Sequence, residues 1–142
     1  MIILDTDHVS LLQRPRSSQA QVLLRRLANC GDPEIAVTIV TVEEQMRGWL
    51  QVIARYRDPM QQIAYYDKLI EFIRFFNNWT ILPFHATSVQ LFRNLRSAKI
   101  RISTNDLKIA ASSIDRNALL LTRNTVDFQR VPGLRFEDWT KP

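Results

Sequence analysis

The stretch Ile2-Ile3-Leu4-Asp5-Thr6-Asp7 decides the fold, because three apolar residues run directly into residues that favour turns and helix caps. Such a run predicts a short buried strand, and a helix is expected to follow from His8. The segment Ile35-Ala36-Val37-Thr38 repeats the apolar pattern, and Thr41-Val42-Glu43-Glu44 then opens a long helix. The chain therefore begins as an alternation of strands and helices.

The rest of the chain continues this alternation. Pro59 follows Asp58 and interrupts the long helix, so a helical hairpin is expected. The predicted strands are 2–4, 35–38, 79–83, 118–122 and a last short one around 134–136. The predicted helices are one from residue 8, then 17–30, 41–58, 59–76, 87–95 and 103–114. Nearly continuous apolar strands separated by helices predict the α/β class, with a central parallel sheet flanked by helices on both faces.

Composition agrees with a folded chain and narrows the setting. The chain has 142 residues, 46% of them hydrophobic and 23% charged, and we expect one domain over 1–142. Cys30 is the only cysteine, which excludes an internal disulfide and a cysteine-based zinc site. The opening residues resemble no signal peptide, and no stretch reaches the length of an apolar membrane span. A cytoplasmic protein is therefore expected, and the formal charge of +5 favours polyanionic partners.

Acidic and amide side chains follow the predicted strands at one edge of the sheet. Asp5 follows the first strand, Glu44 lies in the first turn of the helix after the second, and Asp106 opens a later helix. Asn124 and Asp127 follow the strand that ends at Thr122. Because ligands of open α/β sheets bind at the carboxyl ends of the strands, these groups are candidates for one shared site.

A cluster of like charges must either take up a proton or recruit a cation. All of the candidate ligands are hard oxygens, which suit Mg²⁺ or Mn²⁺ better than zinc or copper. Such an ion can activate water and neutralise charge on a phosphodiester, so the pattern favours phosphodiester hydrolysis. The same acids also have structural interpretations, since Thr41-x-x-Glu44 is a capping box and Ser103-x-x-Asp106 is close to one. Asp5 or Asp7 could equally be an N-cap.

Several ordered stretches resemble one protein family over nearly the full chain. They are ILDTD (3–7), TVEEQMRG (41–48), STNDLKIAA (103–111), LTRNTVDF (121–128), VPGL (131–134) and EDW (137–139). In their order and spacing the chain resembles the PIN-domain ribonucleases, and among them the VapC-type toxins of bacterial toxin–antitoxin (VapBC) pairs. The resemblance implies a PIN-like fold, an endoribonuclease acting on RNA, a homodimer, and a cognate VapB-type antitoxin.

The resemblance also implies roles for individual residues. Asp5, Glu44 and Asp106 would bind the catalytic Mg²⁺ or Mn²⁺, with Glu44 preferred over Glu43 because the family's glutamate stands four positions before the glycine, here Gly48. Two threonines would hold the carboxylates in place by forming hydrogen bonds with them. They are Thr6 and Thr104.

Two positions depart from the fullest family pattern. Where many members carry a fourth acid, this chain has Asn124, and Asp127 could supply the missing catalytic carboxylate. The alternative is that Asp127 is an N3 residue facing an Asn124 cap. Asp7 stands where asparagine is common, and it either restores charge or caps the first helix.

Basic, aromatic and histidine side chains give weaker signals. Arg123 and Lys108 are candidate RNA contacts, as are Lys99 and Arg101. Arg47 is expected to form an ion pair with Glu44 three residues earlier, and His8 to lie exposed in the first helix. The aromatic run between Tyr65 and Trp79 could stack bases, although its helical spacing is more typical of a core or a dimer surface.

Two rival functions are open at this point. Asp5-Thr6-Asp7-His8-Val9 fits the Asp-x-Asp pattern of haloacid dehalogenase-like phosphatases, in which Asp5 would be phosphorylated, but the late acidic pair that such enzymes need is missing after Thr122. The other rival is a non-catalytic PIN-like module that binds RNA or protein, which the Asn124 departure would explain.

Overall fold

Five parallel strands form the central sheet of the computed structural model, which describes residues 1–142. Their order across the sheet is β3-β2-β1-β4-β5. The strands are β1 (Ile2–Leu4), β2 (Ile35–Thr38), β3 (Thr80–Leu82), β4 (Leu119–Leu121) and β5 (Arg135–Glu137). The prediction of a parallel sheet with five short strands is confirmed: β1 and β2 have the predicted ends, and the ends of the other three strands are displaced by one residue.

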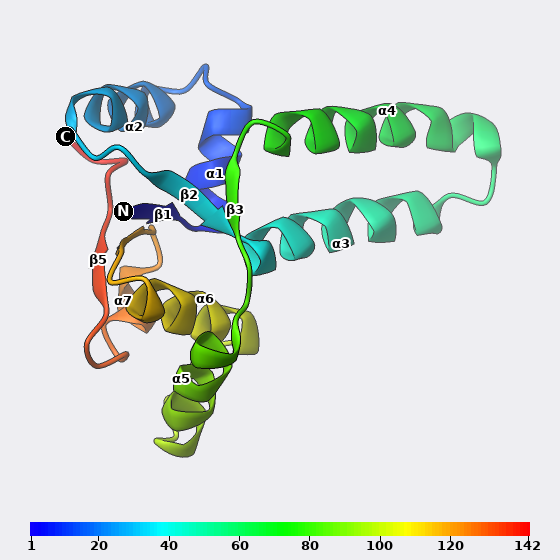
Figure 1. Cartoon of the computed structure of the whole chain (residues 1–142). Helices are drawn as coiled ribbons and strands as arrows, with labels where there is room; N and C mark the ends of the chain where they lie inside the picture. Colours follow the sequence, from blue (N-terminus) through cyan, green and yellow to red (C-terminus); the bar gives the residue numbers. More distant parts are fainter.

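Seven helices connect the strands (Figure 1). They are α1 (Thr6–Gln13), α2 (Ser18–Asn29), α3 (Ile39–Arg55), α4 (Pro59–Phe76), α5 (Ala86–Ser97), α6 (Thr104–Asp115) and α7 (Thr125–Phe128). The expected hairpin is formed by α3 and α4, which project from the sheet side by side. No helix in this set has the length and apolar character needed to cross a membrane.

Helices α1 and α3 both begin two residues earlier than predicted, because the last polar residue before each helix serves as its cap. Asp5 caps α1 and accepts a hydrogen bond from the Thr6 N–H, and Thr38 caps α3 and accepts one from the Thr41 N–H. A residue in extended conformation with a short side-chain acceptor is the ordinary N-cap arrangement. The first polar residue after a strand is therefore already the start of the next helix.

Both faces of the sheet are buried, as predicted, because successive side chains of a strand point to opposite faces. Ile3 and Leu120 belong to one core, which α5 and α6 cover, while Leu4 and Leu121 belong to the other, which includes Leu23 of α2. Figure 1 shows α1 and α2 on the side of the sheet away from α5 and α6. Each fully buried leucine stabilises the fold by about 1.5–3 kcal/mol relative to an exposed one.

The strand order creates a crevice at the centre of the sheet. The chain moves from β1 outward to β2 and β3, and then returns to the other side of β1 to form β4. Leu4 pairs in register with Leu121, so the residues after them, Asp5 and Thr122, emerge side by side. Connections that leave in opposite directions from adjacent strands leave space at the carboxyl edge, where ligands of such sheets bind.

Candidate carboxylate site

Asp5 is the most buried acid at the carboxyl edge of the sheet, with 6% of its surface exposed. One carboxylate oxygen accepts a hydrogen bond from the Thr6 N–H (2.7 Å), and the other accepts one from Thr122 Oγ1 (2.9 Å). Burial, followed by the neighbouring charge of Asp7, raises the pKa of Asp5 to about 7. The fold thus orients this carboxylate firmly while making its negative charge costly.

Glu44 points from α3 towards the same edge and is not part of a capping box. Because α3 begins at Ile39, Thr41 lies inside the helix, and the capping interpretation of Thr41-x-x-Glu44 is wrong. The Glu44 carboxylate instead lies 3.5 Å from Thr6 Oγ1 and 3.4 Å from Asn105 Nδ2, long distances for hydrogen bonds. Burial and then the charge of Asp106 raise the pKa of Glu44. Its contacts span 38 and 61 residues of sequence, which local capping cannot explain.

Asp106 enters the site from the first turn of α6. Ser103 caps this helix and accepts a hydrogen bond from the Asp106 N–H (3.1 Å), as the sequence suggested. Burial raises the pKa of Asp106, contact with the Ser103 hydroxyl lowers it in part, and the charges of Asp127 and Asp7 raise it further. The negative charges of Asp7 on α1 and Asp127 on α7 therefore act on Asp106, which lies near both acids.

Asn124 and Asp127 form a linked pair after β4. Asn124 precedes α7 in the cap position, but its side chain accepts no hydrogen bond from the helix. Its Nδ2 donates instead to Asp127 Oδ2 (3.0 Å), and its backbone N–H donates to Thr122 Oγ1 (3.1 Å). Thr122, which also donates to Asp5, thereby connects this pair to the first strand. We call Asp5, Glu44, Asp106 and Asp127 the carboxylate cluster.

His8 is fully buried, so its predicted exposure is wrong. His8 and Val9 of α1 point into the interior, where His8 contacts the backbone of Trp139 near the C-terminus. His8 Nε2 accepts the Trp139 N–H (3.3 Å), which leaves the proton on Nδ1 to be donated to Asp7 Oδ1 (2.7 Å). The other Asp7 oxygen accepts the Arg123 N–H (2.8 Å). Asp7 thus does not cap α1, since Asp5 has that role.

Thr6 and Asn105 are the side chains that contact the Glu44 carboxylate. Thr104, the expected partner, is exposed and makes no side-chain hydrogen bond, because it is the first residue of α6. Asn105 was missed, although its position next to Asp106 was a usable signal.

The basic and aromatic candidates separate into two groups. Arg47 pairs with Glu43 one turn earlier and not with Glu44, so the expected ion pair is wrong. Arg123, Lys99 and Arg101 are exposed and Lys108 is half-buried; none of these side chains forms an ion pair. The aromatic run is mostly structural: Phe72 and Phe76 are buried in the core, Phe75 and Trp79 pack against it, and Tyr65 stacks on Tyr56 of α3.

The carboxylate cluster supplies the donor set that a hard divalent cation prefers. Burial and then neighbouring negative charges raise the pKa values of Asp5, Glu44 and Asp106, as expected where negative charge lacks a counter-ion. The side chains are not already closed around a common point, since no three acids, histidines or cysteines lie in a ready metal-binding arrangement. The chemistry of the residues therefore fits a cation. Glu44 and Asp106 are the ligands whose side chains would move to reach it.

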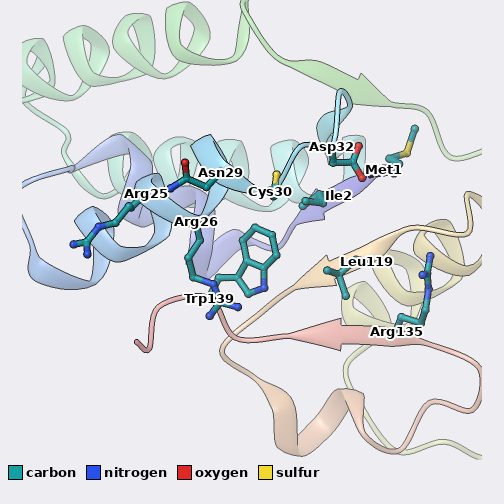
Figure 2. Close-up of a pocket in the computed structure, with 10 residues that line it drawn as sticks. All are labelled: Met1, Ile2, Arg25, Arg26, Asn29, Cys30, Asp32, Leu119, Arg135 and Trp139. Carbon is teal, nitrogen blue, oxygen red and sulfur yellow. Dashed lines mark hydrogen bonds and ion pairs between the residues drawn. The ribbon is translucent and has the colours of Figure 1, made fainter.

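Two depressions lie at opposite ends of the sheet. The larger, about 620 Å³, lies at the amino ends of β1, β4 and β5 and carries arginines without a group of acids (Figure 2). The smaller, about 410 Å³, is lined by Asp7 and by Asn124, which donates to Asp127 of the carboxylate cluster. Size alone would select the wrong end of the molecule, because the acids with raised pKa values are all at the carboxyl edge.

Two known proteins that are similar to this chain are named Ribonuclease VapC1. No family model matches the chain. Ribonuclease VapC1 of Rickettsia felis is 30% identical over 138 residues, which cover 94% of this chain and 92% of that protein. Ribonuclease VapC1 of Haemophilus influenzae strain R2866 is 48% identical over 40 residues, and the match covers only 30% of that protein's length.

Solved structures show the same fold. The structure of VapBC-1 from nontypeable Haemophilus influenzae matches with a TM-score of 0.76 and 22% identity, covering 99% of this chain and 100% of that one. A toxin–antitoxin complex from Klebsiella pneumoniae matches with a TM-score of 0.59 and 19% identity, covering 94% and 95% of the two chains.

Proposed function

The chain belongs to the VapC ribonuclease family, and on that premise we propose that it is a metal-dependent endoribonuclease, the toxin of a toxin–antitoxin pair, that hydrolyses RNA phosphodiester bonds. The observation that carries the proposal is the buried carboxylate of Asp5 beside β4, whose pKa is raised to about 7 by burial and by like charges. A carboxylate so perturbed, at the crevice of an α/β sheet, is typical of a functional site.

The proposed metal ligands are Asp5, Glu44 and Asp106. A bound Mg²⁺ or Mn²⁺ would supply Lewis-acid stabilisation of the phosphodiester and would lower the pKa of water. Thr6 and Thr122 hold the Asp5 carboxylate in one orientation, because each donates a hydrogen bond to a different oxygen. Asn124 orients Asp127, which we propose as the fourth catalytic acid, by donating to its carboxylate.

The proposed substrate is single-stranded RNA, held at the carboxyl edge by exposed cations. Arg123 and Lys108 follow β4 and Asp106 respectively, and neither forms an ion pair within the chain. Free guanidinium and ammonium groups neutralise RNA phosphates and release counterions. The positions of Arg123 and Lys108 favour contacts with the RNA strand on either side of the carboxylate cluster.

The proposed protein partners are a VapB-type antitoxin and a second copy of the chain in the cytoplasm. Support comes from the toxin–antitoxin complex of Klebsiella pneumoniae, which has the same fold. An apolar stripe on α4 is also half exposed and has no partner within the chain. Its residues are Ile63, Tyr66, Ile70 and Ile73, exposed by 51%, 50%, 47% and 54%.

The non-catalytic alternative rests on Asn124, which lacks the charge of a fourth acid. It predicts RNA or protein binding without cleavage. The phosphatase alternative has less support, because Asp5 would have to act as a nucleophile while both of its oxygens accept hydrogen bonds.

The test is cleavage of single-stranded RNA by protein freed of any co-purified inhibitor, with Mg²⁺ or Mn²⁺ and with EDTA. Asp5→Asn should abolish the metal-dependent cleavage and weaken Mn²⁺ binding measured by calorimetry. Asp67→Asn is a matched control, because Asp67 is exposed on α4 and forms no ion pair. Unchanged cleavage by Asp5→Asn would refute the site assignment, and an inactive native protein that binds RNA would favour the non-catalytic alternative.

A further inference from the structure

A polar pocket lies between the carboxylate cluster and the C-terminal tail, and apart from Arg123 and Asn124 its lining residues have no role in the proposed function. Its volume is about 410 Å³, and none of its lining residues is hydrophobic. The lining residues are Asp7, Gln19, Arg123, Asn124, Asp138, Thr140 and Lys141. We call it the tail pocket. A pocket lined only by polar groups favours a hydrated or charged ligand over an apolar one.

The two acids of the tail pocket are already satisfied from within the protein. One Asp7 oxygen faces His8 Nδ1 and the other accepts the Arg123 N–H. Asp138 Oδ1 accepts the Thr140 N–H (2.9 Å) and hydroxyl (2.6 Å), and its Oδ2 lies 3.4 Å from Lys141 Nζ. Burial alone would raise the pKa of Asp138, but the hydrogen bonds from Thr140 and Lys141 hold it below its ordinary value. These carboxylates therefore offer a cation little free coordination.

The groups that remain free in the tail pocket are donors. The Arg123 guanidinium forms no ion pair or hydrogen bond, since only its backbone N–H is used. The Gln19 amide, in the first turn of α2, is exposed and also has no hydrogen-bond partner. Lys141 is 77% exposed, and its one contact with Asp138 is a loose ion pair. The formal charges of the lining residues cancel, because two acids and two basic residues are present. The acids are occupied within the chain, so the charged groups that remain available to a ligand are positive.

Buried His8 joins the two walls of this pocket. It donates to Asp7 on one side and accepts from the Trp139 N–H on the other, with its ring fully buried. The tail is thereby fixed to α1 across 131 residues of sequence, and Arg123 is held by the Asp7 carboxylate. A buried hydrogen-bond chain of this kind sets the geometry of the donors before any ligand arrives.

We propose that the tail pocket binds a phosphate of the RNA strand next to the one that is cleaved, through Arg123, Lys141 and Gln19. This rests on the proposed function and adds the C-terminal tail to the RNA-binding surface. A phosphate suits the site because it is an anion with several acceptor oxygens, and guanidinium, ammonium and amide groups all donate to it. Asn124 lines the pocket and also donates to Asp127 of the carboxylate cluster, which places this phosphate along the same RNA strand.

The test measures binding of a fluorescent single-stranded RNA in EDTA, where no metal-dependent cleavage occurs, over a range of salt concentrations. The double variant Arg123→Gln/Lys141→Gln is compared with Arg25→Gln/Arg93→Gln, which removes the same charge from exposed positions on α2 and α5. We expect the first variant to bind about tenfold more weakly and to lose about 0.7 from the slope of log K against log salt, the loss expected for one phosphate contact. The control should change affinity less than about threefold, a loss due to net charge alone.

A neutral methylphosphonate, moved along the RNA one position at a time, locates the contact. It should weaken binding to the native protein at one position and have no effect there on the Arg123→Gln/Lys141→Gln variant. Equal affinities of the two double variants, or a methylphosphonate effect that persists in the pocket variant, would overturn the tail-pocket proposal. A native protein that binds RNA in this way but does not cleave it would instead leave the pocket standing and refute the proposed catalysis.

Discussion

The two ends of the central sheet handle charge in opposite ways. At the amino edge, the N-terminal ammonium donates to Asp32 (2.8 Å), and this hydrogen bond lowers the pKa of Asp32 (Figure 2). Arg135 donates to the Asn117 carbonyl, and Arg26 lies over the Trp139 ring. At the carboxyl edge, burial and then neighbouring negative charges instead raise the pKa values of Asp5, Glu44 and Asp106.

The difference separates structural charge from functional charge. At the amino edge the N-terminal ammonium compensates the charge of Asp32 within the chain, so the pKa of Asp32 is lowered and its charged form is favoured. The carboxylate cluster keeps like charges together in a partly buried crevice, which destabilises the folded chain unless another ion compensates them.

The largest effect is expected for Asp5→Asn. The substitution keeps the shape of the side chain but removes the charge that we propose binds the metal. RNA cleavage should fall by about 100-fold or more, as when an electrostatic stabiliser is removed from an active site. Initial rates in Mg²⁺ with the native protein in parallel give the comparison. A loss below about tenfold would mean that Asp5 is no more important than its neighbours.

The second prediction concerns the pH dependence of stability in EDTA. The pKa of Asp5 is about 7 in the folded chain and 3.8 as the reference for the unfolded one, so the folded chain holds the extra proton. Its contribution to stability is complete below about pH 4 and is lost as the pH rises through 7. We expect the free energy of unfolding to fall by about 2–4 kcal/mol from pH 4 to pH 8. Urea titrations should show a clearly smaller fall for Asp5→Asn.

The amino edge should respond with the opposite sign. The pKa of Asp32 is lowered, so its contribution is present above about pH 4 and is lost as the pH falls through the folded value. Lowering the pH should therefore reduce the contribution of the amino edge to stability, whereas raising the pH should reduce that of the carboxyl edge. If native and Asp5→Asn proteins had parallel stability profiles between pH 4 and pH 8, the raised pKa of Asp5 would be disproved.

A matched pair of substitutions tests whether His8 positions the carboxyl edge. His8→Asn can still donate to Asp7 from the Nδ1 position, whereas His8→Gln reaches only towards Trp139. Cleavage should fall about tenfold or more in His8→Gln and remain within about threefold in His8→Asn. Faster exchange of the Arg123 amide in His8→Gln, measured by NMR, would report the loosened Asp7 contact. Equal behaviour of the two variants would show that His8 serves packing alone.

The smallest effect on activity is expected for Asp32→Asn at the amino edge. The substitution removes the charge that faces the N-terminal ammonium, so the thermal midpoint should drop slightly at pH 7. Cleavage should equal that of the native protein, because Asp32 lies at the other end of the sheet. A large loss of cleavage at unchanged stability would contradict the division of the two edges.

Much of the fold followed from local pattern, and the errors came from contacts distant in sequence. Strands β1, β2 and β4 are wholly or almost wholly apolar runs, which made them predictable from local pattern, whereas β5 has a single apolar residue, Phe136. The start of α3 was not predictable, because Thr38 belongs at once to β2 and to the helix cap, and the capping box at Thr41 was wrong as a result. His8 was misplaced because its partner, Trp139, lies 131 residues away.

The sequence by itself determined that acids follow the strands, and therefore that they gather at the carboxyl edge of a parallel sheet. Only the tertiary structure decided which of these acids are compensated, because that depends on β4 lying beside β1 and bringing Thr122 to Asp5. It also decided that Asp7 is committed to His8 and Arg123, while Glu44 and Asp106 have few partners. The physical reason is that hydrophobic periodicity is local, whereas burial and charge pairing arise between segments that meet only when the sheet forms.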